Sequence, residues 1–168
     1  MAETVQSLRV QVIITGTVIG DDGAKLVVNE TYDKTFSEGT GTDQVGAVWQ
    51  DKSRNLNATS EDIDLDALTD FQGATMSSLA NLGLFYARNL DTDSGDGFTF
   101  GGAAANPWDG AGTPFEVAGG KIGLGADGIF LWVSPVDKGA IGAGSADTLK
   151  VESQDNSNYR MILAGDNA

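Results

Sequence analysis

Residues 8–18, LRVQVIITGTV, alternate apolar and polar side chains over most of their length. The apolar residues at every second position are Leu8, Val10, Val12, Ile14 and Val18. Side chains spaced by two share one face of a β-strand, so this stretch predicts a long strand. Residues 20–23 (GDDG) favour a turn, and an apolar pattern resumes at Leu26. The first 36 residues are therefore expected to form a β-hairpin.

Shorter patterns of the same kind follow. Val45–Leu56 and Leu82–Asn89 combine apolar, aromatic and polar residues in a way that favours a third strand and a central strand. Residues 61–68 (EDIDLDAL) alternate acidic and apolar side chains, which is typical of an edge strand with its carboxylates in water. A short helix over residues 66–80 is the alternative, with Asp66 as its cap.

The C-terminal half supplies the remaining strands. Ile129–Val133 (IFLWV) is the most apolar run in the chain and predicts a strand buried on both faces. Residues 149–153 and 159–163 flank a turn-rich segment and predict a second hairpin. Between residues 91 and 144 lie 14 of the 23 glycines and all 3 prolines, which indicates loops and short strands.

These elements indicate a single all-β domain spanning residues 1–168. Eight to ten short strands separated by turns are typical of a β-sandwich, and the expected architecture is jelly-roll-like, with an N-terminal β-hairpin and glycine-rich loops. A chain of 168 residues with 40% hydrophobic residues is large enough to bury a substantial core.

Composition excludes several chemistries. The chain has no His and no Cys, which rules out Ser-His-Asp and Cys-His catalysis, imidazole or thiolate zinc sites, and disulfides. A formal net charge of −14, without any cluster of basic residues, makes nucleic acid and anionic membranes poor partners. The N-terminus lacks the order of a secretion signal, so synthesis in the cytoplasm is expected. No catalytic residue, cofactor or metal is predicted.

Three motifs suggest alternative activities, each weakly. Gly123, Gly125 and Gly128 have dinucleotide-binding spacing, but an apolar strand pattern follows them where that motif requires a helix. Asp91, Asp93 and Asp96 could hold Ca²⁺ in an irregular loop, although a solvated turn is the commoner outcome. The carboxylates of residues 61–70 could in principle supply the acid and base of a glycosidase.

Trp108 is a candidate interface residue of a different kind. It follows Pro107 in a glycine-rich loop, where a large exposed ring is costly unless something covers it. Two alternatives remain open: the indole forms a lid within its own chain, or it contacts another subunit.

The order of several segments resembles a known class of protein. The segments are Phe85–Asp91 (FYARNLD), Phe98–Gly102, Gly128–Pro135 (GIFLWVSP), Ala146–Val151 and Tyr159–Leu163. In this order they are similar to small virion structural proteins of tailed bacteriophages, of the capsid decoration (cement) type. The resemblance implies a non-enzymatic protein at the virion surface that binds the major capsid protein lattice. It supplies no catalytic residue.

Together these observations lead to a hypothesis about assembly. Many copies, as trimers or another cyclic homo-oligomer, would attach to a capsid by multivalency. The N-terminal hairpin within residues 1–42 would act as an assembly arm, and its candidate interface residues are Leu8, Val10, Val12 and Ile14. The alternative is a carbohydrate-binding module of a phage tail or fibre, assisted by Ca²⁺.

Overall fold

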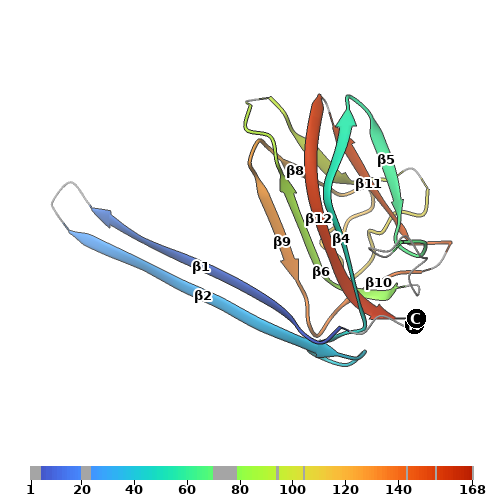
Figure 1. Ribbon diagram of the computed structural model, residues 1–168, viewed down its shortest axis with the longest axis horizontal. Coiled ribbons are helices and arrows are strands. Elements are labelled where there is room, and N and C mark those ends of the chain that lie inside the picture. The colour runs from blue at the N-terminus through green and yellow to red at the C-terminus, as the bar shows by residue number, and fades with distance from the viewer. Residues whose placement is uncertain are drawn as a thin grey trace.

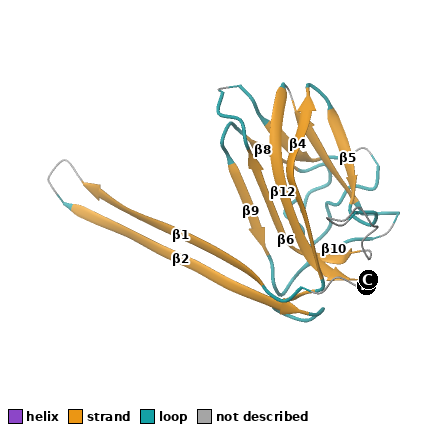
Figure 2. Ribbon diagram, in the orientation of Figure 1, coloured by secondary structure: helices purple, strands orange, loops and turns teal. Residues whose placement is uncertain are grey.

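The structure is a computed structural model that describes residues 5–19, 24–69, 79–93, 95–103, 105–142, 144–153 and 155–167. Within these residues the chain forms β-strands and no helix, so the fold is all-β (Figure 2). The strands are β1 (Leu8–Ile19), β2 (Lys25–Glu38), β3 (Gln44–Val45), β4 (Ala47–Asn57), β5 (Ser60–Asp64), β6 (Leu79–Asn89), β7 (Phe98–Gly101), β8 (Lys121–Leu124), β9 (Ile129–Val133), β10 (Gly139–Ala140), β11 (Thr148–Ser153) and β12 (Asn156–Asn167).

Two antiparallel sheets pack against each other as a β-sandwich. One has the strand order β10-β6-β12-β4, with β9 also paired to β6, and the other has the order β5-β11-β7-β8. Their facing side chains form the main core, in which Phe85 meets Phe100 edge-on at 5.6 Å between ring centroids. Tyr159 meets Phe98 in the same way at 4.9 Å, so aromatic rings from both sheets interlock.

The predicted N-terminal hairpin is confirmed. β1 and β2 pair without interruption from Leu8 opposite Phe36 to Ile19 opposite Lys25. Figure 1 shows this two-stranded ribbon projecting away from the sandwich. Twelve paired positions at about 3.4 Å each give a ribbon about 40 Å long. We call β1 and β2 together the arm, and the end of the arm that joins the sandwich its root. The predicted turn at residues 20–23 lies outside the described residues.

Most of the shorter predicted strands are also present. Residues 82–89 belong to β6, which lies inside its sheet between β12 and β9. Residues 60–64 form β5, an edge strand with Asp62 and Asp64 exposed and Ile63 buried, as the alternating pattern predicts. The alternative helix over 66–80 lies mostly in residues 70–78, which the structure does not describe.

The prediction that Ile129–Val133 is buried on both faces is wrong. β9 pairs with β6 and lies at the edge of its sheet, and Ile129 is 59% exposed. Phe130 and Trp132 pack against the main core, whereas Leu131 and Val133 pack against a smaller cluster on the other face. An apolar run is required because both faces make apolar contacts, but the edge position leaves the strand half-buried.

The predicted second hairpin is also wrong. β11 pairs with β5 and β7, whereas β12 pairs with β4 and β6 in the other sheet. Leu149 and Val151 of β11 are fully buried, as are Met161 and Leu163 of β12. The two strands therefore contribute these side chains to the same core from opposite sheets.

The carboxylate of Glu152 on β11 makes the free energy of unfolding depend on pH. Glu152 accepts a hydrogen bond from Lys121 at 2.7 Å and lies beside Lys150, and these two ammonium groups lower its pKa from 4.5 to about 2. Because the folded pKa is below the unfolded one, the stabilisation is present above pH 4.5 and is lost as the pH falls through 2. Chemical denaturation between these pH values should show a stability slope that Glu152→Gln makes shallower. An unchanged slope would contradict this assignment.

Candidate assembly interface

The strand register gives the arm two distinct faces. Directly opposed residues of an antiparallel pair project from the same side, so each pair can be assigned to a face. One face carries Leu8, Val10, Val12, Ile14, Leu26, Val28, Tyr32 and Phe36, together with Gly16, Glu30 and Lys34. We call this the apolar face. All four arm residues predicted as interface residues lie on it, and they therefore form one continuous surface.

The apolar face is buried at the root and exposed further along the arm. Phe36 is fully buried at the root, whereas Ile14 is 56% exposed and Leu26, further out, is 62% exposed. Tyr32 and Val28 are more than a third exposed. A contiguous apolar patch of this kind usually marks an interaction site, and a two-stranded ribbon alone is at best marginally stable in water.

The opposite face of the arm is more polar. Arg9 donates a hydrogen bond from Nε to Asp33 Oδ1 at 2.8 Å, and Gln11 donates to the same carboxylate. The bond from Arg9 lowers the pKa of Asp33. Thr15, Thr17, Asn29, Thr31 and Thr35 share this face with the apolar residues Ile13, Ile19 and Val27. Near the root, the side chains on this opposite face are polar, whereas those on the apolar face at the same distance from the root are mostly apolar.

The root of the arm joins a second hydrophobic cluster. Phe36 and Val45 are buried there with Leu84 of β6 and Ala164 of β12. The partly buried residues that pack around them are Val5, Leu8, Val10, Val48, Tyr86, Leu131, Val133 and Ile162. Leu84 and Tyr86 alternate with the core residue Phe85 along β6, so this cluster lies on the outer face of the sheet. The apolar face of the arm is therefore continuous with the outer face of the sandwich.

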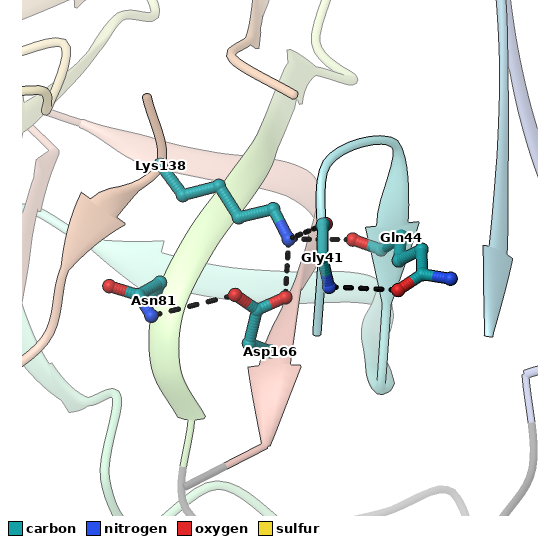
Figure 3. A network of polar contacts seen from close by, with 5 residues as sticks. All are labelled: Gly41, Gln44, Asn81, Lys138 and Asp166. Carbon is teal, nitrogen blue, oxygen red and sulfur yellow. Dashed lines mark hydrogen bonds and ion pairs between the residues drawn. The ribbon is translucent and has the colours of Figure 1, made fainter. Parts of the chain in front are cut away.

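A buried ion pair anchors the loop that follows the arm. Lys138 pairs with Asp166, and each side chain is only 6% exposed. Figure 3 shows the Lys138 ammonium also donating to the backbone carbonyls of Gly41, at 2.9 Å, and Gln44, at 2.8 Å. The amide of Asn81 donates to the second Asp166 oxygen at 3.5 Å. All three ammonium donors are used, so one lysine joins the loop to β12 of the sandwich.

Further contacts fix the direction of the arm. Lys34 of β2 forms an ion pair with Asp43, whose backbone N–H donates to the carbonyl of Pro135 at 3.2 Å. Ser37 N–H donates to the Asp43 carbonyl at 3.1 Å, and β2 then pairs in parallel with β3. The root is thus held by side-chain and backbone bonds together. An arm with a fixed direction binds with less loss of conformational entropy than a free one.

Sequence reasoning did not find this anchor. Lys138 lies 97 residues from Gly41 and 28 from Asp166, and no local pattern links these positions. The arm, by contrast, was found through the alternation of residues 8–18, which is a local signal.

The interface role of Trp108 is corrected by the structure. Trp108 is 2% exposed, and its indole N–H donates to the carbonyl of Ala140 at 3.1 Å. Phe115 and Trp132 each meet the indole edge-on at 5.9 Å between centroids. The ring is covered by its own chain, because it belongs to the main core, and this is the intrachain alternative.

The structure also describes the surroundings of the aspartate loop at residues 91–96 and of the glycine motif at residues 123–128. Both Asp91 carboxylate oxygens accept hydrogen bonds from Asn158, and Asp96 has its pKa raised by partial burial and by nearby Asp155, Asp91 and Asp93. Across the described ranges, no group of three or more His, Cys, Asp or Glu residues is placed to hold a metal ion. The same ranges contain no helix long and apolar enough to cross a membrane. Gly123 lies in β8, and Gly125 and Gly128 lie between β8 and β9, so a strand follows where a nucleotide site requires a helix.

No protein-family model matches this chain, and no curated protein is significantly similar to it in sequence. Function is therefore inferred from the residues and their geometry.

Proposed function

We propose that this protein is a structural component of a bacteriophage virion, which decorates or stabilises the capsid by attaching in many copies through its arm. The observation that supports this proposal is the projecting arm itself. Its apolar face stays exposed on one chain, while the root is anchored by Lys138 and Lys34. A rigid element that exposes apolar surface is suited to contacts between subunits.

The free edge of the arm offers a way to bind a capsid protein. In the sheet order β1-β2-β3, β1 is the edge strand along its full length. An exposed edge can accept a strand from a neighbouring protein through main-chain hydrogen bonds, with little demand on the partner's sequence. The partner we propose is the major capsid protein lattice, and each weak edge contact gains strength from repetition over the particle.

The sandwich topology is compatible with this role. With the two-residue strand β10 left out, the sheet orders are β4-β12-β6-β9 and β5-β11-β7-β8. We interpret this order as jelly-roll-like, because strands adjacent in sequence alternate between the two sheets, except for the β7–β8 hairpin, as in two interlocked Greek keys. Jelly rolls occur in viral capsid and lectin domains, so the topology favours a virion protein without deciding its place on the particle.

The composition suits a protein that is attached in many copies to a particle surface. A cysteine-free, histidine-free chain has no thiol to oxidise and no imidazole to titrate near neutral pH. A net charge of −14 opposes nonspecific clumping where many copies are crowded together. Both properties would let the protein act as an inert structural element.

Shortening the arm tests the proposal. Residues 13–31 can be removed and Val12 joined to Tyr32 by an Asn-Gly turn, which keeps Phe36 and the Lys34–Asp43 pair at the root. The variant should fold but fail to co-sediment with particles assembled from the same virus. Ile14→Lys should weaken binding, whereas Val117→Lys, at a 73% exposed position outside the arm, should not.

Two outcomes would count against the proposal. Full binding by the shortened variant would exclude the arm as the attachment element. Particle images in which the protein is confined to the tail, with binding to cell-surface glycans that a chelator abolishes, would favour a carbohydrate-binding module instead.

A further inference from the structure

The outer face of the β9-β6-β12-β4 sheet carries three basic residues that are distant in sequence. Arg88 of β6 and Arg160 of β12 are directly opposed. Ala87 and Met161, which follow them along the two strands in the opposite sense, are fully buried in the core, so both arginines project from the outer face. Arg160 donates from Nε to the backbone carbonyl of Lys52 at 3.1 Å, which places Lys52 of β4 beside it. We call these three residues the basic row.

The charge of the basic row is largely uncompensated. The chain has 24 acidic residues, yet Arg160 and Lys52 form no ion pair within the described part of the chain. Arg88 pairs with Asp127 at 2.7 Å, but its Nε is buried there without a hydrogen-bond partner. Like charges that are directly opposed on neighbouring strands destabilise a sheet. A bound partner that carries carboxylates would turn this unfavourable arrangement into a favourable one.

The surroundings of the basic row suit a protein partner. Tyr86 and Ile162 are opposed to each other on the side toward the root, and both are only partly buried. Ile129 of β9 is opposed to Arg88 and is 59% exposed. Tyr and Arg together are enriched in protein–protein interfaces. A long polyanion such as nucleic acid is a poorer fit, because it meets the field of a chain with a net charge of −14.

We propose that the basic row binds a carboxylate-bearing surface of the major capsid protein and is a second attachment site beside the arm. This contact rests on the proposed role in capsid attachment and adds the chemistry of the partner. Arg88 lies four positions from Leu84 along β6, so the row is about 13 Å from the cluster at the root. The apolar face of the arm is continuous with this outer face, so one capsid subunit can contact both, and the two contacts strengthen each other.

Charge reversal in the full-length chain tests the contact. Arg160→Glu replaces the repulsion with Arg88 by an attraction, so the variant should be at least as stable as wild type in urea denaturation. Its Kd for particles assembled from the same virus should nevertheless rise at least about tenfold in co-sedimentation. Arg160→Lys keeps the charge and should bind like wild type. A residue with a purely structural role would change stability and binding together.

Two controls locate the effect on this face. Lys121→Glu makes the same change of charge on β8 of the other sheet, at a 46% exposed side chain, and should bind like wild type. A carbodiimide joins an ammonium group to a carboxylate in contact with it. Treatment of the attached chain should therefore link Lys52 to an Asp or Glu of the capsid protein, which mass spectrometry of the digested complex identifies.

The possible failures are distinguishable. If wild type binds particles and Arg160→Glu binds equally tightly, the basic row is not an attachment site, while attachment through the arm stands. Weaker binding by Arg160→Glu with an equal loss of stability would also overturn the contact, as would carbodiimide links that never include Lys52. If wild type does not bind particles at all, both this contact and the proposed function are wrong.

Discussion

Replacing Lys138 with Met is expected to lower the free energy of unfolding by about 3 to 5 kcal/mol, because it leaves the buried carboxylate of Asp166 without its counter-charge. The carbonyls of Gly41 and Gln44 also lose their shared donor. The loss should appear in urea denaturation as a lower midpoint. The same substitution frees the loop that follows the arm, so amide exchange should accelerate at residues 39–46.

Two matched variants make this prediction specific. Lys121→Met removes an ion pair whose lysine is 46% exposed, and it should cost less stability than Lys138→Met, because solvent screens an exposed pair. Replacing Lys138 and Asp166 together, by Met and Leu, removes both buried charges and should recover part of the stability lost in the single variant. If Lys138→Met were as mild as Lys121→Met, the anchor would not have the role assigned to it.

Truncation of Trp108 is expected to have an effect of similar size. Trp108→Ala should cost about 3 to 5 kcal/mol of stability, because it empties a large volume from a close-packed core. The indole packs edge-on against two aromatic rings, and a Cβ built on Gly139 would lie 2.9 Å from the indole. Thermal or urea unfolding of the purified chain measures this loss.

The result also distinguishes between the two interpretations of Trp108. A buried core residue predicts lower stability with attachment to particles intact under folding conditions, and Trp108→Phe should be the milder change. Normal stability combined with lost association would return the indole to an intersubunit contact and contradict its observed burial.

Local patterns were sufficient to predict the arm and several strands. Alternation over residues 8–18 needs only nearest neighbours in sequence, and the acidic alternation around Ile63 correctly indicated an edge. The run Ile129–Val133 misled because apolar composition reports contact with apolar surfaces and not the number of neighbouring strands. Its two faces contact two different clusters, yet its edge stays open.

Long-range contacts could not be predicted in this way. The separation of β11 and β12 into different sheets depends on which strands lie beside them, and those partners are distant in sequence. Lys138 looks like any surface lysine until the chain folds and brings Gly41, Gln44 and Asp166 around it. Trp108 was recognised as a residue that something must cover, but only packing identified Phe115 and Trp132 as part of that cover.

The account depends on the apolar face of the arm being covered in the assembled protein. The chain has no native cysteine, so Ile14→Cys introduces a unique thiol on that face and Thr15→Cys introduces one on the opposite face. The rate of alkylation of each thiol by iodoacetamide can be compared between the free chain and the chain attached to particles. We predict that the thiol at position 14 becomes protected while the thiol at position 15 stays reactive. Equal reactivity of both thiols on the attached chain would contradict this interpretation.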